Sequence, residues 1–411
     1  MAGRGKPTEA GGIPRYRETA LPALFSQGFR PFFLGAAVWA PAAMVLWILQ
    51  LAGCLDLPIA FDPPAWHAHE LIFGFAQAAM AGFLMTSVPN WTGRMPLQGV
   101  PLLVLAATWA TGRAAMAVSA LIGEFPTAFI DLLFPTLLLA ALGREILAGR
   151  NWRNLPMMAA LALMLVANLS THLAAAGLTA DKTFGARVGI AVLGAMISLV
   201  GGRLIPSFTR NRLARMGAST RPAPFGSLDR LALAVVPLAL AAWAFGLASS
   251  VTGPLLVLAA ALAAARLARW HGWRTTGDAS LWPLHAGYGW LALGLALLGA
   301  SELQPTLSPM AGLHALTIGA IGTTILAVMG RATFSQTSRR TAEPRAAGAI
   351  AISVAVSAVS RILASLLSDL HEPLLWLAAL AWIAAFVLFI VSHGRALLAP
   401  KGRNTEAPAP R

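Results

Sequence analysis

Cysteine and charged residues are both scarce in this sequence of 411 residues. The one cysteine, Cys54, excludes an intramolecular disulfide and a cysteine-ligated zinc or iron–sulfur centre within a single chain. Charged residues make up 11% of the chain and hydrophobic residues 57%, whereas a soluble domain carries about 25% charged residues. So little charge cannot cover a water-exposed globule of this size. These shortages predict a polytopic membrane protein.

Sequence motifs of nucleotide-binding proteins, c-type cytochromes and triad hydrolases are missing too. The sequence contains no phosphate-binding P-loop, no Gly-x-Gly-x-x-Gly, no Cys-x-x-Cys-His and no triad-like pattern, which argues against nucleotide hydrolysis and covalent c-type haem. The formal net charge of +14 would suggest nucleic acid in a soluble protein. Here the basic residues are dispersed between apolar runs, so they indicate membrane topology and no nucleic-acid partner.

Long apolar runs are what the chain has in abundance. A membrane-spanning helix needs about 20 mostly apolar residues, and twelve such runs predict an all-α, polytopic membrane helical bundle. Only Ser250-Val251 separates the seventh run from the eighth, so a tight helical hairpin is expected there. The predicted spans are 31–52, 68–90, 99–119, 125–147, 155–177, 184–208, 231–249, 252–269, 280–300, 308–330, 346–368 and 373–394.

The loops predict the orientation of the bundle. With a cytoplasmic N-terminus, 26 of the 30 lysine and arginine residues fall in inner segments. The other four are Arg113, Lys182, Arg187 and Arg361. The outer loops instead carry acidic residues. This positive-inside asymmetry predicts that both termini lie in the cytoplasm.

Three parts of the chain follow from these spans. Residues 1–30 form a basic cytoplasmic segment and residues 31–396 form the membrane domain. The basic cytoplasmic loop 210–230 divides this domain into six plus six spans, although no motif of the first half recurs in the second. Residues 397–411 are rich in proline and charge, which predicts a disordered tail.

Histidines inside the spans are the first candidate site residues, because an ionisable side chain in hydrocarbon is costly. His67 and His69 open the second span from outside, while His172 and His314 lie about 8 and 9 Å below the outer ends of their spans at the helical rise. Four imidazoles at one depth are how a helical bundle builds a metal or haem site. Alternatively, each imidazole hydrogen-bonds a neighbouring helix. His285 lies near the inner end of its span and would need a displaced helix or a second site.

The segment FDPPAWHAHELIFGF (61–75) carries two of these histidines beside a carboxylate. Its Asp-Pro start predicts a helix that begins before the histidines. His67 and His69 then point about 200° apart at 3.6 residues per turn and cannot easily bind one ion. They could serve two sites, or one could be a ligand and the other a packing residue. Glu70 could orient an imidazole or carry protons, or it could be a carboxylate that the helix dipole stabilises.

Three arginines lie in the outer halves of spans. Haem carries two propionates, and arginine suits bidentate pairing with a carboxylate. The alternative is that an arginine snorkels to the outer headgroups. Snorkelling fits Arg187 and Arg361 better than Arg113, which lies deeper. Arg113 is therefore the predicted propionate partner.

These residues also carry a resemblance to a known family. The sequence resembles the NnrS family, bacterial inner-membrane proteins that contain haem and copper and are associated with nitric oxide stress and denitrification. The stretches that carry the resemblance are GFRPFF (28–33), WHAHELIFGF (66–75), AGFLMTSVPNWTG (81–93), ANLSTHLAAAG (167–177), GGRLIPSFTRNRL (201–213), LHAGYGWLALGL (284–295) and HALTIGAIGTTILAVMGRAT (314–333).

The resemblance implies a non-covalent b-type haem and copper, with nitric oxide or a nitrosyl-iron species as ligand. It does not divide the histidines between the two cofactors. One departure is SQTSR (335–339), where Gln336 stands at the histidine of the family's Gly-His-Thr-Gly-Arg-like stretch. The family pattern falls on His67, His69, Glu70, His172, Arg203, His285, His314 and Arg331.

Two other functions remain open. Twelve spans divided six plus six are also typical of a secondary transporter of a small molecule. An accessory factor for a respiratory metalloenzyme would need no chemistry of its own. The sequence decides neither whether a substrate is turned over nor the oligomeric state.

Overall fold

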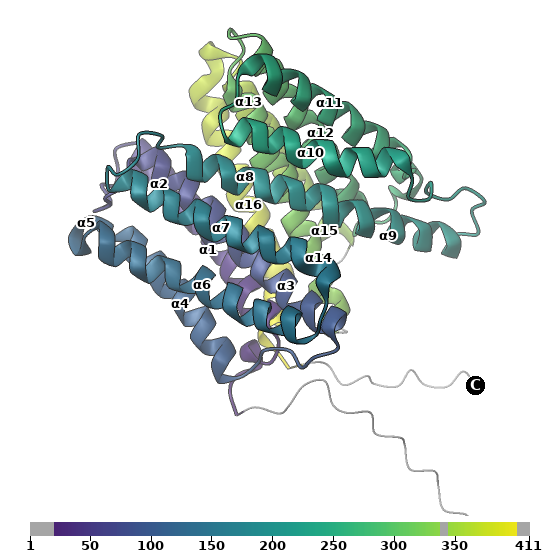
Figure 1. The fold of residues 1–411 in the computed structure, drawn as a ribbon, viewed down its shortest axis with the longest axis horizontal. Coiled ribbons are helices and arrows are strands. Elements are labelled where there is room, and N and C mark those ends of the chain that lie inside the picture. Colours follow the sequence, from purple (N-terminus) through teal and green to yellow (C-terminus); the bar gives the residue numbers. More distant parts are fainter. Residues whose placement is uncertain (1–19, 338–343, 401–411) are drawn as a thin grey trace, which may run out of the picture.

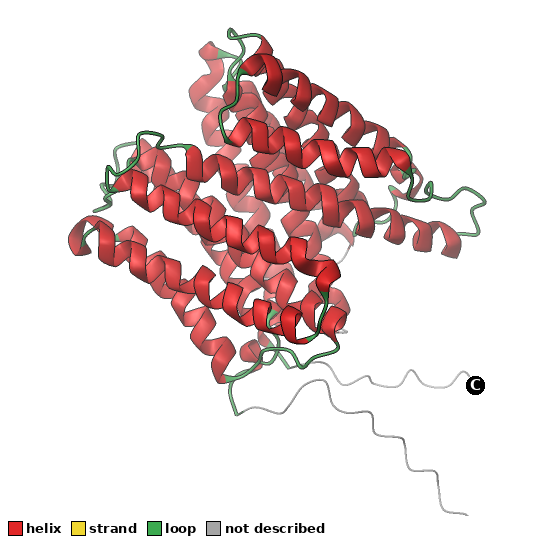
Figure 2. Ribbon diagram, viewed as in Figure 1, coloured by secondary structure: helices red, strands yellow, loops and turns green. Residues whose placement is uncertain are grey.

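The described part of the chain folds into a bundle of helices. The computed structural model describes residues 20–337 and 344–400. Most of the predicted basic N-terminal segment and of the predicted disordered tail lies outside the described residues. Helices are the regular secondary structure that these residues form (Figure 2). The predicted all-α class is therefore confirmed.

Twelve of the helices are long and apolar enough to cross a membrane, as the hydropathy predicted. Some consist of several segments in sequence. The spans are α1 (Phe29–Leu51); α2 (Pro63–His69), η2 (Glu70–Ala76) and α3 (Gln77–Thr92); α4 (Val100–Ala117); α6 (Glu124–Ala148); η3 (Trp152–Asn154) and α7 (Leu155–Ala175); α8 (Phe184–Met196), η4 (Ile197–Gly201) and α9 (Gly202–Arg215); α10 (Ser227–Ala244); α11 (Ser249–Ala268); α12 (Trp282–Leu303); α13 (Pro309–His314), η6 (Ala315–Gly322) and α14 (Thr323–Thr337); α15 (Pro344–Ala364); and η7 (Ser368–Leu370) with α16 (His371–Leu398). The short elements η1 (Ala23–Phe25), α5 (Ser119–Ile122) and η5 (Gly272–Thr275) lie between spans.

The turn between the seventh and eighth spans lies earlier than predicted. Helix α10 ends at Ala244 and α11 begins at Ser249, so Ser250 and Val251 are helical rather than the connection. Gly246 has a φ of 66°, a left-handed conformation that glycine adopts without steric cost and that stops a helix. The prediction placed the turn wrongly because the apolar run continues past this glycine.

Three spans contain a π-helical segment, η2, η4 or η6. Such segments are rare and occur frequently at functional sites. Segment η2 directly follows His69, and η6 directly follows His314. The helices before them, α2 and α13, both have a proline in the first turn. The second and tenth spans thus have the same order of features: a proline in the first turn, a histidine, and then a π-helical segment. We call the end of the bundle near these two histidines the outer end.

The first and last spans pack together in the bundle. Helix α1 contacts α3 and α16, and α16 packs along α15, so the first and last spans lie side by side (Figure 1). The guanidinium of Arg30, which is buried, donates hydrogen bonds to the carbonyl oxygens of Ala396, Leu397 and Ala399 at 3.2, 3.0 and 2.6 Å. A cation at the carbonyl end of α16 is favoured by the helix dipole.

The orientation predicted from the loops can be tested with the single cysteine. Cys54 is exposed in the loop between the first two spans. We expect a membrane-impermeant maleimide to label it in intact cells of a Gram-negative host, because that loop is predicted to face outward. In a Cys54→Ser background, a cysteine at exposed Ser219 should react only after permeabilisation. The opposite pattern of labelling would reverse the orientation.

Candidate metal centre and the neighbouring cavity

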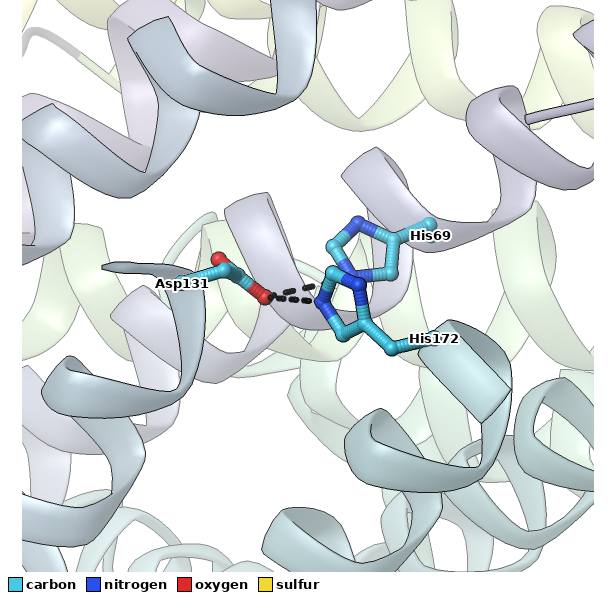
Figure 3. A group of neighbouring side chains, drawn as sticks. All are labelled: His69, Asp131 and His172. Carbon is cyan, nitrogen blue, oxygen red and sulfur yellow. Dashed lines mark hydrogen bonds and ion pairs between the residues drawn. The ribbon is translucent and has the colours of Figure 1, made fainter. Parts of the chain in front are cut away.

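Two histidines and an aspartate converge near the outer end of the bundle. His69 is the last residue of α2, Asp131 belongs to α6 and His172 to α7. All three are buried. The Asp131 Oδ2 atom lies 3.2 Å from His172 Nε2 and 3.3 Å from His69 Nε2 (Figure 3). The three potential ligand atoms lie within 4.8 Å of one another. We call these residues the His–Asp–His cluster.

Neighbouring side chains hold the cluster in this orientation. Asn168, one turn before His172 on α7, accepts a hydrogen bond from His69 Nε2 at 2.8 Å and donates one to Asp131 Oδ2 at 2.8 Å. His172 Nδ1 lies 2.7 Å from a carboxylate oxygen of Glu124, at the start of α6. Such partners fix which ring nitrogen of a histidine is free to bind a metal.

A buried arginine joins the cluster to a second carboxylate. Arg113, on α4, donates from Nη1 to both carboxylate oxygens of Glu70 at 2.7 and 2.8 Å, and from Nη2 to Asp131. Trp39 Nε1 donates to Glu70 at 2.7 Å, and His69 Nδ1 lies 3.0 Å from the same carboxylate. Glu70 therefore has partners on three other elements, α1, α2 and α4.

Glycine at position 74 makes this approach possible. A Cβ atom there would lie 2.7 Å from the Trp39 indole nitrogen and 2.8 Å from Arg113 Nη1. These separations are too short for any side chain without a shift of its neighbours. Gly74 thus admits the tryptophan and the arginine to Glu70.

The carboxylates of this network, when ionised, outnumber its one guanidinium. Three carboxylates, Glu70, Glu124 and Asp131, face one guanidinium, Arg113. With neutral imidazoles the net charge is two negative units, and unpaired charge is costly in a buried site. Two protonated histidines would balance it, and so would one divalent cation bound to two neutral histidines.

The other two outer histidines point into a separate space. His67 and His314 both line an outer cavity of about 710 Å³, and both line a deeper and more apolar pocket of about 120 Å³. His67 stacks on Trp47 with ring centroids 4.8 Å apart. His69 also borders the outer cavity, so the two spaces are neighbours. The structure divides the four histidines of one depth into two pairs.

Two buried nitrogens in this cavity lack hydrogen-bond partners among the described residues. His314 Nδ1 lies 2.8 Å from the Met310 carbonyl oxygen, which can only accept, so the Nε2 atom carries the free lone pair. His67 Nδ1 and Arg361 Nη1 have no hydrogen-bond partner among the described residues. Buried polar atoms are normally paired. These orphaned atoms are what a polar ligand in the cavity would satisfy.

The three arginines of the outer halves lie in different surroundings. Arg113 is engaged by Glu70 and Asp131, while Arg187 and Arg361 border the outer cavity. Arg187 donates to Asp181 at 2.6 Å at the cavity mouth. Slight burial acts to raise the pKa of the Asp181 carboxyl, but hydrogen bonds from Thr183 and Arg187 outweigh it and hold that pKa below its usual range.

Two residues singled out from the sequence lie away from both sites. His285, on α12, lies 2.9 Å from Thr209 Oγ1 on α9 and packs near Trp270 at the inner end of the bundle. Gln336 lies near the end of α14, about 33 Å along the span from His314 at 1.5 Å per residue. A histidine at position 336 could therefore not join the pair formed by His67 and His314.

Three members of the network were not predicted from the sequence: Asp131, Asn168, and Glu124 as the partner of His172. Asp131 had a signal, because it is a carboxylate in the middle of an apolar span. Asn168 precedes His172 by four residues, which puts both on one helix face. Glu124 falls just before the predicted span 125–147, whereas it is the first residue of α6.

The fold and the site define a polytopic membrane protein with a histidine–carboxylate cluster and a histidine-lined cavity near one end of the bundle. The family model described as NnrS protein matches residues 23–401, nearly the whole chain. The chain therefore belongs to the NnrS family, and the resemblance seen in the sequence is confirmed. No curated protein matches the chain.

Removing the arginine tests how strongly the network depends on it. We expect Arg113→Gln to lower the free energy of unfolding by about 3–5 kcal/mol, because it leaves two buried carboxylates unpaired. The measurement is denaturant unfolding of the purified protein in detergent micelles. Arg144→Gln is the control, since Arg144 is 69% exposed where it pairs with Glu145, and such pairs contribute about 0–1 kcal/mol. Equal losses for both variants would contradict the central role of Arg113.

Proposed function

We propose that this chain is a haem- and copper-binding protein of the bacterial inner membrane that acts in the response to nitric oxide or in denitrification. Membership of the NnrS family supports the physiological setting. The observation that carries the proposal is the division of the outer histidines into two pairs with different surroundings. Each pair suits one of the two cofactors.

The outer cavity fits a haem. Its volume of about 710 Å³ lies in the usual range for small-molecule and cofactor sites, about 300–1,000 Å³. His67 and His314, on two different helices, offer imidazole nitrogens to the iron. Arg361, with its unpartnered Nη1, and Arg187 at the cavity mouth would pair with propionates. This assigns the propionates to different arginines from the one predicted from the sequence.

The His–Asp–His cluster fits a transition-metal ion. Two ligands about 2.1 Å from one ion lie about 3.4 Å apart at a tetrahedral angle, close to the 3.2 and 3.3 Å from Asp131 Oδ2 to the two imidazoles. A divalent ion would also cancel the two excess negative charges of the network. Imidazole and carboxylate donors suit copper, and the same set is typical of ferrous iron. Copper is the ion that the family resemblance implies.

The chain's own residues prepare both sites for these cofactors. A bound haem would supply an iron centre that binds a diatomic gas, and a bound copper would supply a second redox centre close to it. Met310 orients the imidazole of His314, and the carboxylates of Glu124 and Glu70 lie at the Nδ1 atoms of His172 and His69. Both Nε2 atoms therefore face Asp131. The deeper pocket has mainly apolar walls, which include Met44, Ile72 and Phe75.

Substitutions that separate the two cofactors test the proposal. We expect His314→Ala to remove the haem Soret absorption of the purified protein and to leave copper bound at the wild-type ratio. We expect His172→Ala to lower bound copper at least tenfold and to retain the Soret band. The measurements are an optical spectrum and elemental analysis of the same preparations. His271→Ala, outside both sites, is the control for folding and yield.

Three outcomes would contradict the proposal. A colourless and metal-free wild-type protein from haem-replete cells would remove both cofactors. Loss of both cofactors in each variant would show that the histidines form one shared site. Iron in place of copper at the cluster would keep the site but change the ion and the proposed chemistry.

A further inference from the structure

A third cavity lies near the opposite end of the bundle, far from the outer histidines. It has a volume of about 530 Å³ and is enclosed by residues of α9, α12, α14, α15 and α16 and by the loop 277–280. It shares no lining residue with the outer cavity or the deeper pocket. Neither the His–Asp–His cluster nor the proposed haem site accounts for it.

The mouth of this inner cavity is basic. Arg212, Arg215 and Arg331 line it together with one carboxylate, Asp278, which leaves two positive charges in excess. Arg331 lies over the ring of Phe208 at 3.9 Å and donates to Ser280 Oγ at 3.0 Å. The packing against the aromatic ring presents the guanidinium toward the cavity.

Arg212 has unused hydrogen-bonding capacity at the same place. Its Nε lies 3.6 Å from Asp278 Oδ2, within the range of an ion pair but beyond that of a hydrogen bond. The Nε atom is buried and has no hydrogen-bond partner among the described residues. Because guanidinium groups pair readily with phosphate, the mouth suits a phosphate-bearing ligand.

The interior of the cavity is apolar except at one point. Leu326, Ile350, Val354 and Phe389 form its walls. Thr323, which is 4% exposed, borders the cavity with a hydroxyl that has no hydrogen-bond partner among the described residues. Thr323 lies about 12 Å along α14 from Arg331 at 1.5 Å per residue, so the polar mouth and this hydroxyl are well separated.

We propose that the inner cavity binds one anionic phospholipid. Its phosphate would lie among the three arginines and its apolar part between α14, α15 and α16. A free phosphate ion matches the arginines but leaves the apolar walls unused. The cavity also lies at the arginine-rich end of the bundle, where basic residues attract anionic lipid headgroups. This proposal does not depend on haem or copper.

Lipid binding to the full-length protein tests the proposal. We expect native mass spectrometry of the delipidated protein in neutral detergent to detect one tightly bound phosphatidylglycerol per chain. The double variant Arg215→Gln/Arg331→Gln should weaken that binding at least tenfold. The matched control Arg210→Gln/Arg230→Gln removes the same charge from exposed positions outside the cavity and should stay within twofold of the wild type.

A second variant separates the cavity from its charge. Gly330 faces the cavity, and a Cβ atom there would lie 3.3 Å from the imidazole of His393. Gly330→Leu should fill the space and weaken phosphatidylglycerol binding at least tenfold with no change of charge. Variants are compared at wild-type elution volume and melting temperature.

Four results would overturn the proposal. Equal loss in the matched control would show general electrostatic attraction rather than a site. Unchanged affinity in Gly330→Leu would show that the apolar cavity does not hold the ligand. Displacement of phosphatidylglycerol by 10 mM inorganic phosphate would assign the arginines to a free anion. Phosphatidylcholine should bind at least tenfold more weakly, and equal binding would exclude recognition of the anionic headgroup.

Discussion

The ion pairs of one arginine hold the outer end of the first five spans together. Arg113 binds two carboxylates, Glu70 and Asp131, from two other helices. Most of the remaining members of the network contact one or the other of these two carboxylates. Glu70 in turn is bound by the Trp39 indole, and Asp131 faces both histidines of the cluster. Unpaired charge inside a membrane protein is costly, so each of these partners depends on the guanidinium.

The second span serves two sites because two of its histidines are separated by one residue. His69 turns toward Asp131 and His172, whereas His67 turns toward Trp47 and the cavity that His314 also lines. The short helix α2 therefore contributes one histidine to the His–Asp–His cluster and one to the cofactor-sized cavity. That arrangement suits the two neighbouring cofactors that we propose.

Hydropathy predicted all twelve spans, since length and apolar content are local properties of the sequence. Helical spacing also predicted that His67 and His69 point in different directions. The depth of a histidine along its span does not show which helices are neighbours. Four histidines at one depth therefore could not be divided into two pairs. For the same reason, Arg113 could not be matched to Glu70 and Asp131, whose helices meet it only in the folded bundle.

Local backbone features were equally hard to predict. The π-helical segments after His69 and His314 change the register of the side chains that follow. Amino-acid composition does not predict such segments. The six-plus-six division and the orientation of the termini stay predictions, because the helices alone do not show which end of the bundle faces the cytoplasm. The inner cavity was not predicted at all, since its arginines come from separate segments, α9 and α14.

The central claim is that the outer histidines form two distinct sites for two different metals. Anomalous X-ray diffraction from crystals of the purified protein, recorded at the iron and copper absorption edges, tests it most directly. The account predicts a copper peak between His69, Asp131 and His172 and a separate iron peak in the cavity beside His67 and His314. A single peak shared by all four histidines, or iron in the cluster and none in the cavity, would contradict it.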